Sequence, residues 1–320
     1  VLGIGIKGAA NGMAEAAIQC INKLSDRNRV VAIDVPSGLN ADTGAAEGAV
    51  VLADHTVAIG MPKTGLLAAE AINFVGSLEV VDIGFSDAGG KVDGGEIELI
   101  TAGDLITLFP RRPRATHKGA CGHLLIIAGA RGFSGAAAMA SAAALHSGVG
   151  LVSVLTPASV AGTVAQLVPE AMVFPGRENP AGGLHEAFTD QVPKKLADFD
   201  AFLLGPGMTA SASTLKIVEQ VLAVSRRPVV LDADALNVFR ANLAGIRKAK
   251  CPVVITPHPG ELGNLMGLSA AVVQCKRTEY ARRASELCGG VAVLKGAGTL
   301  VANAYAQAPF ADAKSKLKIT

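Results

Sequence analysis

Carboxylate and amide side chains directly follow two apolar runs of this 320-residue chain. Asp34 ends the run VVAI in VVAIDVPSGL, and Asp232, Asp234 and Asn237 follow the run VVL in VVLDADALN. A carboxylate fixed at the end of a strand can relay protons. Aspartate is also a preferred helix N-cap, so Asp34 and one aspartate of DADALN could instead cap the helices that follow. The two segments predict candidate sites, with capping as the alternative for each.

Two further segments carry groups that could bind or transfer charge. His258 lies between two prolines in TPHPGEL, with Glu261 in the next helical turn. An imidazole with a pKa of about 6.5 exchanges hydrogen bonds near neutral pH, although a lone loop histidine is more often structural. Glu261 alone indicates ordinary compensation of the helix dipole. Lys295 interrupts VAVLKGAGTLVA, expected as one strand, where a lysine must pair, bind an anion or extend to water.

Two glycine-rich segments could hold negatively charged ligands on their backbone. LLIIAGARGFSGAAAMASAAA reads as a strand, a turn and a helix of small residues, and the first amides of a helix attract phosphate. Its glycines, Gly129, Gly132 and Gly135, lack the spacing of the dinucleotide fingerprint and could merely allow close packing. GIGIKG, at residues 3–8, is a turn of low specificity that on its own is more often structural.

These residues must be positioned by alternating strands and helices. β-Branched runs surround an alanine-rich helix in the first 85 residues, and further apolar runs alternate with helical segments from residue 123. The repetition from residue 123 predicts a parallel sheet covered on both faces, with ligands at the carboxyl ends of its strands, and the first 85 residues read as βαβ material. We expect the helix at residues 14–24 and strands at residues 30–35, 55–60, 78–83, 124–128, 151–155, 201–204, 229–232, 253–256 and 291–295.

A break in this periodicity separates two units. Residues 86–95 are rich in Gly and Asp, residues 96–100 could form a short strand, and the basic, proline-broken segment FPRRPRATHKG follows. The tail at residues 306–320 is polar and ends near KSKLK, which by composition predicts a divergent, solvated terminus. We expect a linker with a first strand at residues 87–110, and a second domain at residues 111–305.

Composition excludes several classes of protein. Half of the residues are hydrophobic and only 4% aromatic, with 37 glycines and no tryptophan, which is typical of an enzyme-like α/β scaffold. The net charge of +2 predicts neither nucleic-acid nor membrane binding. The five cysteines form no CxxC pair, so we expect reduced, mostly buried thiols in a cytoplasmic protein. The opening VLGIGIKG is already a strand-and-turn pattern, and we expect sequence to be missing before it.

The motifs of the first unit resemble those of a known family. GIGIKG, DVPSG, ADTG, MPKTGL and VVDIGF are similar, in this order, to the second half of the Rossmann-like NAD(P)HX epimerase domain. The resemblance implies that Asp34 is the acid/base residue and Ser37 a potassium ligand. It assigns backbone contacts with the substrate to Gly3, Gly5 and Gly8. The family's upstream Asn- and Gly-rich loop and an aspartate of its potassium site have no counterpart here, so residues 1–86 are expected to be a partial epimerase domain.

The motifs of the second unit resemble a different family. GPG, DADALN, TPHPGE and VLKGAGT, in this order after RRPRATHKG, are similar to the ADP/ATP-dependent NAD(P)HX dehydratase, a ribokinase-like α/β fold with a parallel sheet. The resemblance implies nucleotide contacts for Lys295, Gly296, Ala297, Gly298 and Thr299. It implies that the substrate cleft is lined by Ala136, Gly207, His258, Asp232 and Asn237.

The two resemblances together imply repair of hydrated NADH and NADPH. ADP or ATP with Mg²⁺ would drive dehydration of NAD(P)HX, the epimerase unit with K⁺ would interconvert the hydrate epimers, and the protein would be a homo-oligomer. After Thr299 this sequence lacks the family's GGTGD-like loop, whose aspartate does the acid/base work. We therefore expect a fragment truncated at both ends, a diverged reading frame or an inactive nucleotide-binding pseudoenzyme. A small-alcohol kinase of the same fold is a further alternative.

Overall fold

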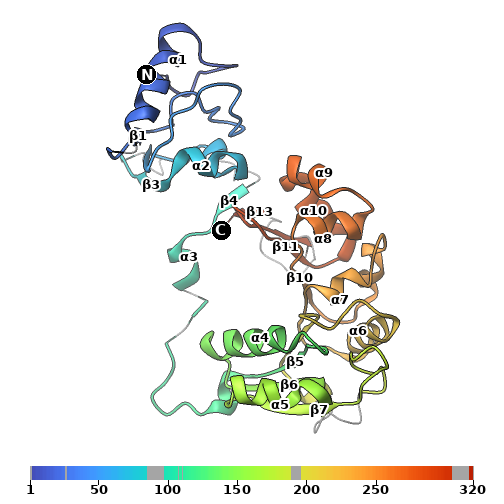
Figure 1. Ribbon diagram of the computed structural model, residues 1–320. Coiled ribbons are helices and arrows are strands. Elements are labelled where there is room, and N and C mark those ends of the chain that lie inside the picture. The colour runs from blue at the N-terminus through green and yellow to red at the C-terminus, as the bar shows by residue number, and fades with distance from the viewer. Residues whose placement is uncertain are drawn as a thin grey trace. The chain divides into compact units, whose positions relative to one another are not determined.

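The computed structural model contains two compact units (Figure 1). The first comprises the described residues up to 84, and the second nearly all of those from 97 onward. Of the linker and entry strand expected at residues 87–110, residues 87–96, 107 and 110 lie outside the described part of the chain. The structure describes residues 2–25, 27–84, 97–106, 108–109, 111–188, 196–304 and 317–319.

The first unit is built on a 3-stranded parallel sheet in the order β1-β2-β3. Its strands and its long helix lie where the sequence predicts them, because short β-branched runs form the sheet and an alanine-rich segment forms the helix. The elements are α1 (Gly12–Leu24), β1 (Val31–Ile33), β2 (His55–Ile59), η1 (Thr64–Leu67), η2 (Ala69–Ala71), α2 (Ile72–Val75) and β3 (Ser77–Val81).

One face of this sheet packs on a core and the other does not. In β1, Ala32 is buried, whereas Val31 and Ile33 are 57% and 73% exposed. The buried side continues into a cluster that includes Leu39 and Leu66. Parallel sheets are ordinarily covered on both faces. Within the described residues, the face of β1 that carries Ile33 is therefore uncovered.

The second unit is built on a 10-stranded sheet in the order β4-β13-β12-β11-β10-β9-β8-β5-β6-β7. The neighbours from β11 to β7 are parallel, as the sequence predicts. The chain leaves β7 and returns beside β5 as β8, so the strand order reverses between β5 and β8. Ligands bind at such a reversal, at the carboxyl ends of the strands. The strands are β4 (Ile97–Leu99), β5 (His123–Ile127), β6 (Leu151–Pro157), β7 (Met172–Gly176), β8 (Ala201–Leu204), β9 (Val229–Leu231), β10 (Val253–Ile255), β11 (Val291–Leu294), β12 (Leu300–Asn303) and β13 (Leu317–Ile319).

Two corrections concern the end of the chain. VAVLKGAGTLVA is not one interrupted strand but the antiparallel pair β11 and β12, in which Leu294 pairs with Leu300. The tail is not wholly a solvated terminus, since residues 317–319 form β13 between β4 and β12. Composition misled the prediction in both cases. The glycines before β12 mark a reversal of the chain rather than an interruption, and the alternation LKI of β13 fits a strand despite its lysine. Residues 305–316 lie outside the description.

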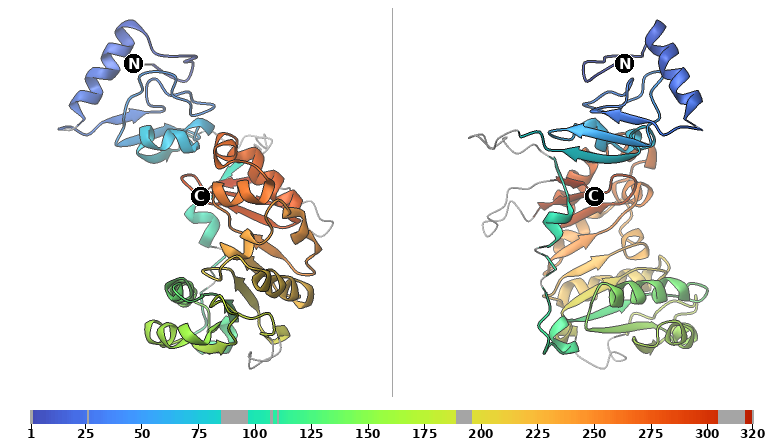
Figure 2. Two further views of the ribbon diagram at one scale, coloured as in Figure 1. Left: turned by 45° about the vertical axis from the view of Figure 1, so that its right-hand side comes forward. Right: turned by 90° about the vertical axis from the view of Figure 1, so that its left-hand side faces the viewer.

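Helices pack along this sheet (Figure 2). α4 and α5 pack against each other and on β5 to β7, while α10 packs on β11 and β12. The strands β5 and β6 are buried almost throughout, which confirms the predicted cover on both faces there, whereas β9 and β10 bury only alternate residues completely. The helices are α3 (Ala102–Ile106), α4 (Ser134–His146), α5 (Ala158–Leu167), α6 (Ala212–Val224), α7 (Asp234–Asn237), α8 (Pro259–Met266), α9 (Ala270–Cys275) and α10 (Arg277–Cys288), with 3-10 turns η3 (Lys118–Cys121), η5 (Leu196–Asp198) and η6 (Leu243–Lys248).

Two properties of the chain as a whole can be compared with the sequence. No helix within the described ranges combines the length and apolar character that crossing a membrane requires. All five cysteines are free thiols, as expected, but only Cys251 and Cys288 are buried, so the expectation of mostly buried thiols is wrong. Burial raises the pKa of the Cys288 thiol to about 11, which keeps it protonated and unreactive.

Candidate active site

Three side chains meet where strands of the second unit end. Asp232 follows β9, Thr256 follows β10 and Lys295 follows β11, and the three strands are parallel neighbours. Lys295 Nζ lies 2.7 Å from Asp232 Oδ1, and Thr256 Oγ1 donates to the same oxygen at 2.8 Å. The side chains of Lys295 and Asp232 are 41% and 28% exposed. The lysine in its apolar run therefore has a partner and remains accessible to a ligand.

Glu261 is a second carboxylate beside this lysine. Its Oε2 lies 3.6 Å from Lys295 Nζ, and its side chain is only 10% exposed. A capping box at the start of α8 holds it: Glu261 Oε2 accepts from the His258 amide at 2.8 Å, while His258 Nδ1 accepts from the amides of Gly260 and Glu261. The sequence indicated only dipole compensation, although the spacing of His258 and Glu261 is that of a capping box. We use the name strand-end cluster for Asp232, Thr256, Glu261 and Lys295.

The hydrogen bonds of His258 define which of its nitrogens can meet a ligand. Because Nδ1 accepts two backbone hydrogen bonds, the proton of the neutral ring belongs on Nε2. Nε2 lies 3.7 Å from Glu261 Oε2, beyond a normal hydrogen bond, and the side chain is 56% exposed. His258 can therefore donate from Nε2 to a substrate oxygen while its backbone stays fixed.

Neither aspartate of DADALN caps α7, so the capping alternative is wrong. Asp232 belongs to the strand-end cluster, whereas Asp234 accepts from the Thr209 amide at 2.9 Å and from Asn237 Nδ2 at 3.2 Å. Ala233 between them has φ 49° and ψ −116°, a conformation that costs a residue with a Cβ about 1–3 kcal/mol. The turn thus sends its two carboxylates to different partners, and Asn237 contacts Asp234 rather than Asp232.

Two glycines let the GPG turn fit between neighbouring loops. A Cβ on Gly205, whose φ is 123°, would lie 1.7 Å from the carbonyl oxygen of Asp232. A Cβ on Gly207 would lie 2.9 Å from both Ala136 Cβ and Phe133 Cβ. The structure therefore brings together Ala136 and Gly207, two residues that the sequence assigned to substrate binding.

The glycine-rich loop before α4 is held by the loop that follows β7. The Arg131 amide donates to the Gly182 carbonyl at 2.9 Å, and the Arg131 guanidinium lies 3.0 Å from Glu178 Oε2. The other oxygen of Glu178 accepts from the Ser159 amide at the start of α5. No side chain in the described ranges caps α4, so none competes there with an anion, and anion binding at this helix start stays a prediction.

Glu186 ties the loop after β7 to α6 and predicts a pH-dependent stability. Hydrogen bonds from Ser213 Oγ at 2.6 Å and Lys216 Nζ at 3.0 Å lower the pKa of Glu186 from 4.5 to about 2. Because the pKa of Glu186 is lower in the folded chain than in the unfolded chain, its ionised carboxylate stabilises the fold at pH values above 4.5. This contribution disappears as the pH falls from 4.5 to about 2.

We expect Glu186→Gln to lower the urea midpoint at pH 7 but not at pH 2, whereas Glu219→Gln, at an exposed residue of α6, should have no such effect. An equal loss for Glu186→Gln at both pH values would contradict this account.

The predicted nucleotide-binding segment forms the turn between β11 and β12. Lys295 directly follows β11 and Thr299 directly precedes β12. Gly296 and Gly298 have φ of 140° and 61°, which lets the backbone reverse, and Ala297 lies between them. Of this segment, only Lys295 is part of the strand-end cluster.

Arg277 was not predicted as a site residue, yet its guanidinium holds the backbone at the end of β11, where Lys295 begins the turn. Its residue is 8% exposed, and its guanidinium donates to the carbonyl oxygens of Leu294 at 3.2 Å and Lys295 at 3.4 Å. A buried arginine must satisfy its donors, and backbone carbonyls at the end of β11 do so here. Its position within a helix of alternating charges gave no signal in the sequence.

Asp34, in the first unit, directly follows β1 with φ 69°. Its amide donates to the Val57 carbonyl at 2.7 Å, and its Oδ1 accepts from the Ile59 amide at 3.1 Å and contacts Lys63 Nζ. Burial by itself raises the pKa of Asp34, but the hydrogen bonds from Lys63 and Ile59 and the charge of Lys63 outweigh it and hold the pKa below its usual value. Asp34 is therefore a carboxylate at neutral pH, and it does not cap a helix.

Ser37 connects the Asp34 turn to the opening segment of the chain. Its Oγ accepts from the Leu2 amide and donates to the Leu2 carbonyl, each at 3.1 Å. Gly3 and Gly5 are exposed and have no atom within 4 Å of an added Cβ, while Gly8 has φ 82°. Among the described residues, no group of three or more His, Cys, Asp or Glu side chains is arranged so that it could hold a metal ion. The Ser37 oxygen that the sequence assigns to potassium is engaged with the backbone of Leu2, and its role as a potassium ligand stays a prediction.

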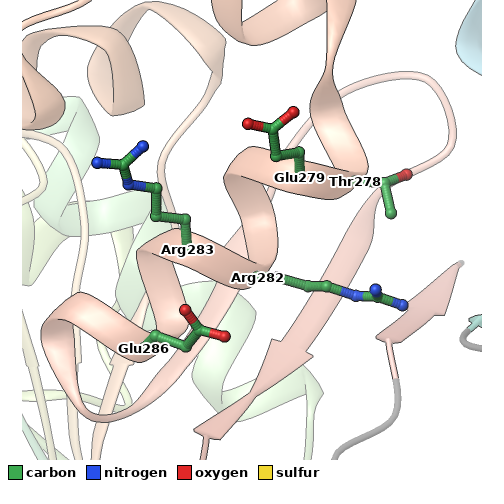
Figure 3. A pocket seen from close by; sticks show the side chains of 5 residues that line it. All are labelled: Thr278, Glu279, Arg282, Arg283 and Glu286. Carbon is green, nitrogen blue, oxygen red and sulfur yellow. The ribbon is translucent and has the colours of Figure 1, made fainter.

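A separate hollow of about 590 Å³ lies on α10 and is lined by Thr278, Glu279, Arg282, Arg283 and Glu286. Figure 3 shows that the side chains leave α10 in different directions: Arg282 extends toward the neighbouring strands, whereas Glu279 and Arg283 extend away from them. Two acids and two bases line it, so it favours neither an anion nor a cation. It contains no residue of the strand-end cluster, and we place the candidate site at the cluster.

The fold and the cluster define the second unit as a ribokinase-like protein. The solved ADP/ATP-dependent NAD(P)H-hydrate dehydratase of Bacillus subtilis, co-crystallised with ATP and Mg²⁺, is 30% identical with a TM-score of 0.56, covering 69% of this chain and 72% of that chain. A ribokinase-like superfamily protein of Enterococcus faecalis, 24% identical with a TM-score of 0.56, covers 70% of this chain and 72% of its own and shares the fold.

Comparison of the sequence with protein-family models identifies the family. The family model described as NAD(P)H-hydrate dehydratase matches residues 124–317, more than half of the chain, so the chain belongs to this family. A second model, described as YjeF-related protein N-terminus, matches residues 1–65. The chain therefore joins parts of two domains, which confirms the resemblances noted in the sequence.

Relatives that contain both domains are longer than this chain. The bifunctional NAD(P)H-hydrate repair enzyme of Moorella thermoacetica is 37% identical over 302 residues, which cover 94% of this chain and 57% of the relative. That of Escherichia coli is 38% identical over 299 residues, which cover 91% and 54%. The chain thus spans a little over half the length of the relatives it matches.

Proposed function

We propose that the second unit uses ADP or ATP to dehydrate hydrated NADH and NADPH. The observation that carries this proposal is Lys295, whose ammonium lies at the carboxyl end of β11 beside Asp232 and remains 41% exposed. An ammonium in this position can exchange its carboxylate partner for a nucleotide phosphate, because both are anions of similar reach. Membership of the dehydratase family and the relative crystallised with ATP and Mg²⁺ support the choice of nucleotide.

The reaction balances without a further reactant. The terminal phosphoryl group of ADP moves to the hydroxyl of the hydrate, which makes that oxygen a good leaving group. Loss of inorganic phosphate from one ring carbon and of a proton from its neighbour restores the double bond of the dihydropyridine ring, so the products are NAD(P)H, AMP, phosphate and a proton. Lys295 binds the phosphates and lowers the charge that opposes transfer.

Mg²⁺ fits the residues beside Lys295. It is usually held in proteins by one or two carboxylates together with substrate phosphates, and Asp232 and Glu261 supply two carboxylates here. When bound, Mg²⁺ would neutralise charge between the phosphates. Its protein ligands would be the carboxylates that hold Lys295 in the structure described here.

The hydrated nicotinamide nucleotide would lie on the loops around the GPG turn. Ala136 and Gly207, both assigned to the substrate by the sequence, lie against each other at this turn, because a Cβ on Gly207 would stand 2.9 Å from Ala136 Cβ. The uncapped start of α4 favours a phosphate of the substrate. His258 would donate from Nε2 to a substrate oxygen, as its hydrogen bonds allow.

We further propose that the first unit interconverts the two epimers of the hydrate, with Asp34 as the acid/base residue. Its fixed, ionised carboxylate at the end of β1 supports this role. The match of residues 1–65 to the N-terminal family model supports it as well. Assembly as a homo-oligomer and a cytoplasmic location stay predictions from the sequence.

The test uses the purified chain with mixed NADHX epimers, Mg²⁺ and ADP. We expect recovery of NADH absorbance that requires ADP, with both epimers consumed. Asp34→Asn should leave one epimer behind while dehydration of the other continues. Binding of ADP without recovery of NADH would make the chain a nucleotide-binding protein without turnover, and a stable phosphorylated hydrate would support the kinase alternative.

A further inference from the structure

Lys63 reaches the Asp34 carboxylate from the loop that follows β2. Its Nζ contacts Asp34 Oδ1 and also donates to the Ile59 carbonyl at 3.2 Å. The side chains of Lys63 and Asp34 are 23% and 28% exposed, so the pair is largely shielded from water. The separation of 29 residues between them in the chain gave no sign of this contact.

The fold brings the two residues together through neighbouring strands. Ile33 at the end of β1 pairs with Val57 in β2, so Asp34 and Ile59 emerge at the same edge of the sheet. The Asp34 amide donates to the Val57 carbonyl, and the Ile59 amide donates to Asp34 Oδ1. Asp34 has φ 69°, which these bonds hold in place. Its carboxylate is thus fixed at the strand ends before any substrate arrives.

The two oxygens of this carboxylate have different surroundings. Oδ1 accepts from the Ile59 amide and contacts the Lys63 ammonium. Within the described part of the chain, no hydrogen bond ends on Oδ2. Oδ1 therefore serves as the anchor, and Oδ2 is the oxygen that can take and return a proton.

We propose that Lys63 is a positioning residue for the epimerase site, which orients the carboxylate of Asp34 and keeps it ionised. The proposal rests on the epimerase function proposed above. Epimerisation returns every atom to the substrate, so the proton that Asp34 accepts goes back in the second half of the reaction. Lys63 supplies the charge that stabilises the carboxylate between these transfers, in a place where burial alone would favour the protonated acid.

The test compares lysine variants by the rate and pH profile of epimerisation in the 320-residue chain. We expect Lys63→Met to lower kcat at least about tenfold, since a poorly oriented base loses much of its effect. The acid limb of the profile should move to higher pH because the carboxylate has lost its cation. Lys63→Arg should restore most of the rate, and Lys23→Met, at an exposed lysine of α1, should change neither quantity.

A second measurement does not depend on activity. The carboxyl carbon of Asp34 can be followed by NMR during a pH titration, with Asp34→Asn identifying its signal. A higher pKa of Asp34 in Lys63→Met supports the proposal, whereas an unchanged pKa and acid limb overturn it. Loss of rate that Lys63→Arg does not restore, with the acid limb unmoved, would reduce Lys63 to a structural role. If the unmodified chain does not epimerise the hydrate, the proposed epimerase function fails, and the titration still decides the role of Lys63.

Discussion

Lys295→Met is expected to abolish ADP-dependent turnover and to weaken ADP binding by roughly 10- to 100-fold, the equivalent of about 1.5–3 kcal/mol for hydrogen bonds to a charged group. The methionine keeps most of the volume but removes the ammonium that would bind phosphate. Calorimetry with ADP and the recovery of NADH absorbance measure the two effects separately. Lys295→Arg should keep part of the affinity, because the charge is preserved although its shape is not.

The matched control for this variant is Lys250→Met, which removes an exposed lysine outside the strand-end cluster. It should bind ADP as the unmodified chain does. Lys295→Met also leaves Asp232 and the nearly buried Glu261 without their cation, so its thermal unfolding must be recorded alongside binding. A folded Lys295→Met variant with unchanged affinity for ADP would refute the assignment of Lys295 to the nucleotide.

Gly205→Ala is expected to destabilise the second unit by roughly 2–5 kcal/mol, from backbone strain and overpacking together. The new Cβ would lie 1.7 Å from the Asp232 carbonyl oxygen, and φ of 123° is unfavourable for alanine. The backbone on both sides must shift, because no flexible side chain can give way. Thermal unfolding followed by circular dichroism measures the loss.

Gly162→Ala, in the same unit, is expected to raise the stability of the fold rather than lower it. Gly162 lies within α5, and a Cβ there would meet no atom within 4 Å. Alanine in a helix restricts the unfolded chain more than glycine does, so we expect a gain of about 0.4–1 kcal/mol. If Gly205→Ala were as harmless as Gly162→Ala, the close packing of the GPG turn against DADALN would be wrong.

Much of the fold could be predicted because its strands are continuous apolar runs. The strands β5, β8, β9, β10 and β11 lie within one or two residues of the expected positions. β7 was missed because MVFPG contains a proline and offers no alternation, and β12 because glycines beside Lys295 suggested an interruption rather than a reversal. Local patterns predict single strands well but not how two segments pair.

The candidate site could be predicted residue by residue but not as an arrangement. Asp232 and Lys295 were expected at strand ends, yet their ion pair depends on β9, β10 and β11 being neighbours, which no local pattern encodes. Glu261 was taken for a simple helix-start acid, and Lys63 was not considered. Each acquires its role from a partner that lies far away in the sequence or in the next loop.

At the strained turn of Ala233, a substitution that raises the stability of the fold is expected to lower catalytic turnover. Glycine at this position would accept φ 49° and ψ −116° without strain, which removes about 1–3 kcal/mol, while the freer unfolded chain takes back about 0.4–1 kcal/mol. Ala233→Gly therefore offers a net gain in stability of up to about 2 kcal/mol. The same glycine would free the turn to move, and with it the directions in which Asp232 and Asp234 point. A lineage that adapts to high temperature at this residue would thus give up some of the order on which its catalytic cleft depends.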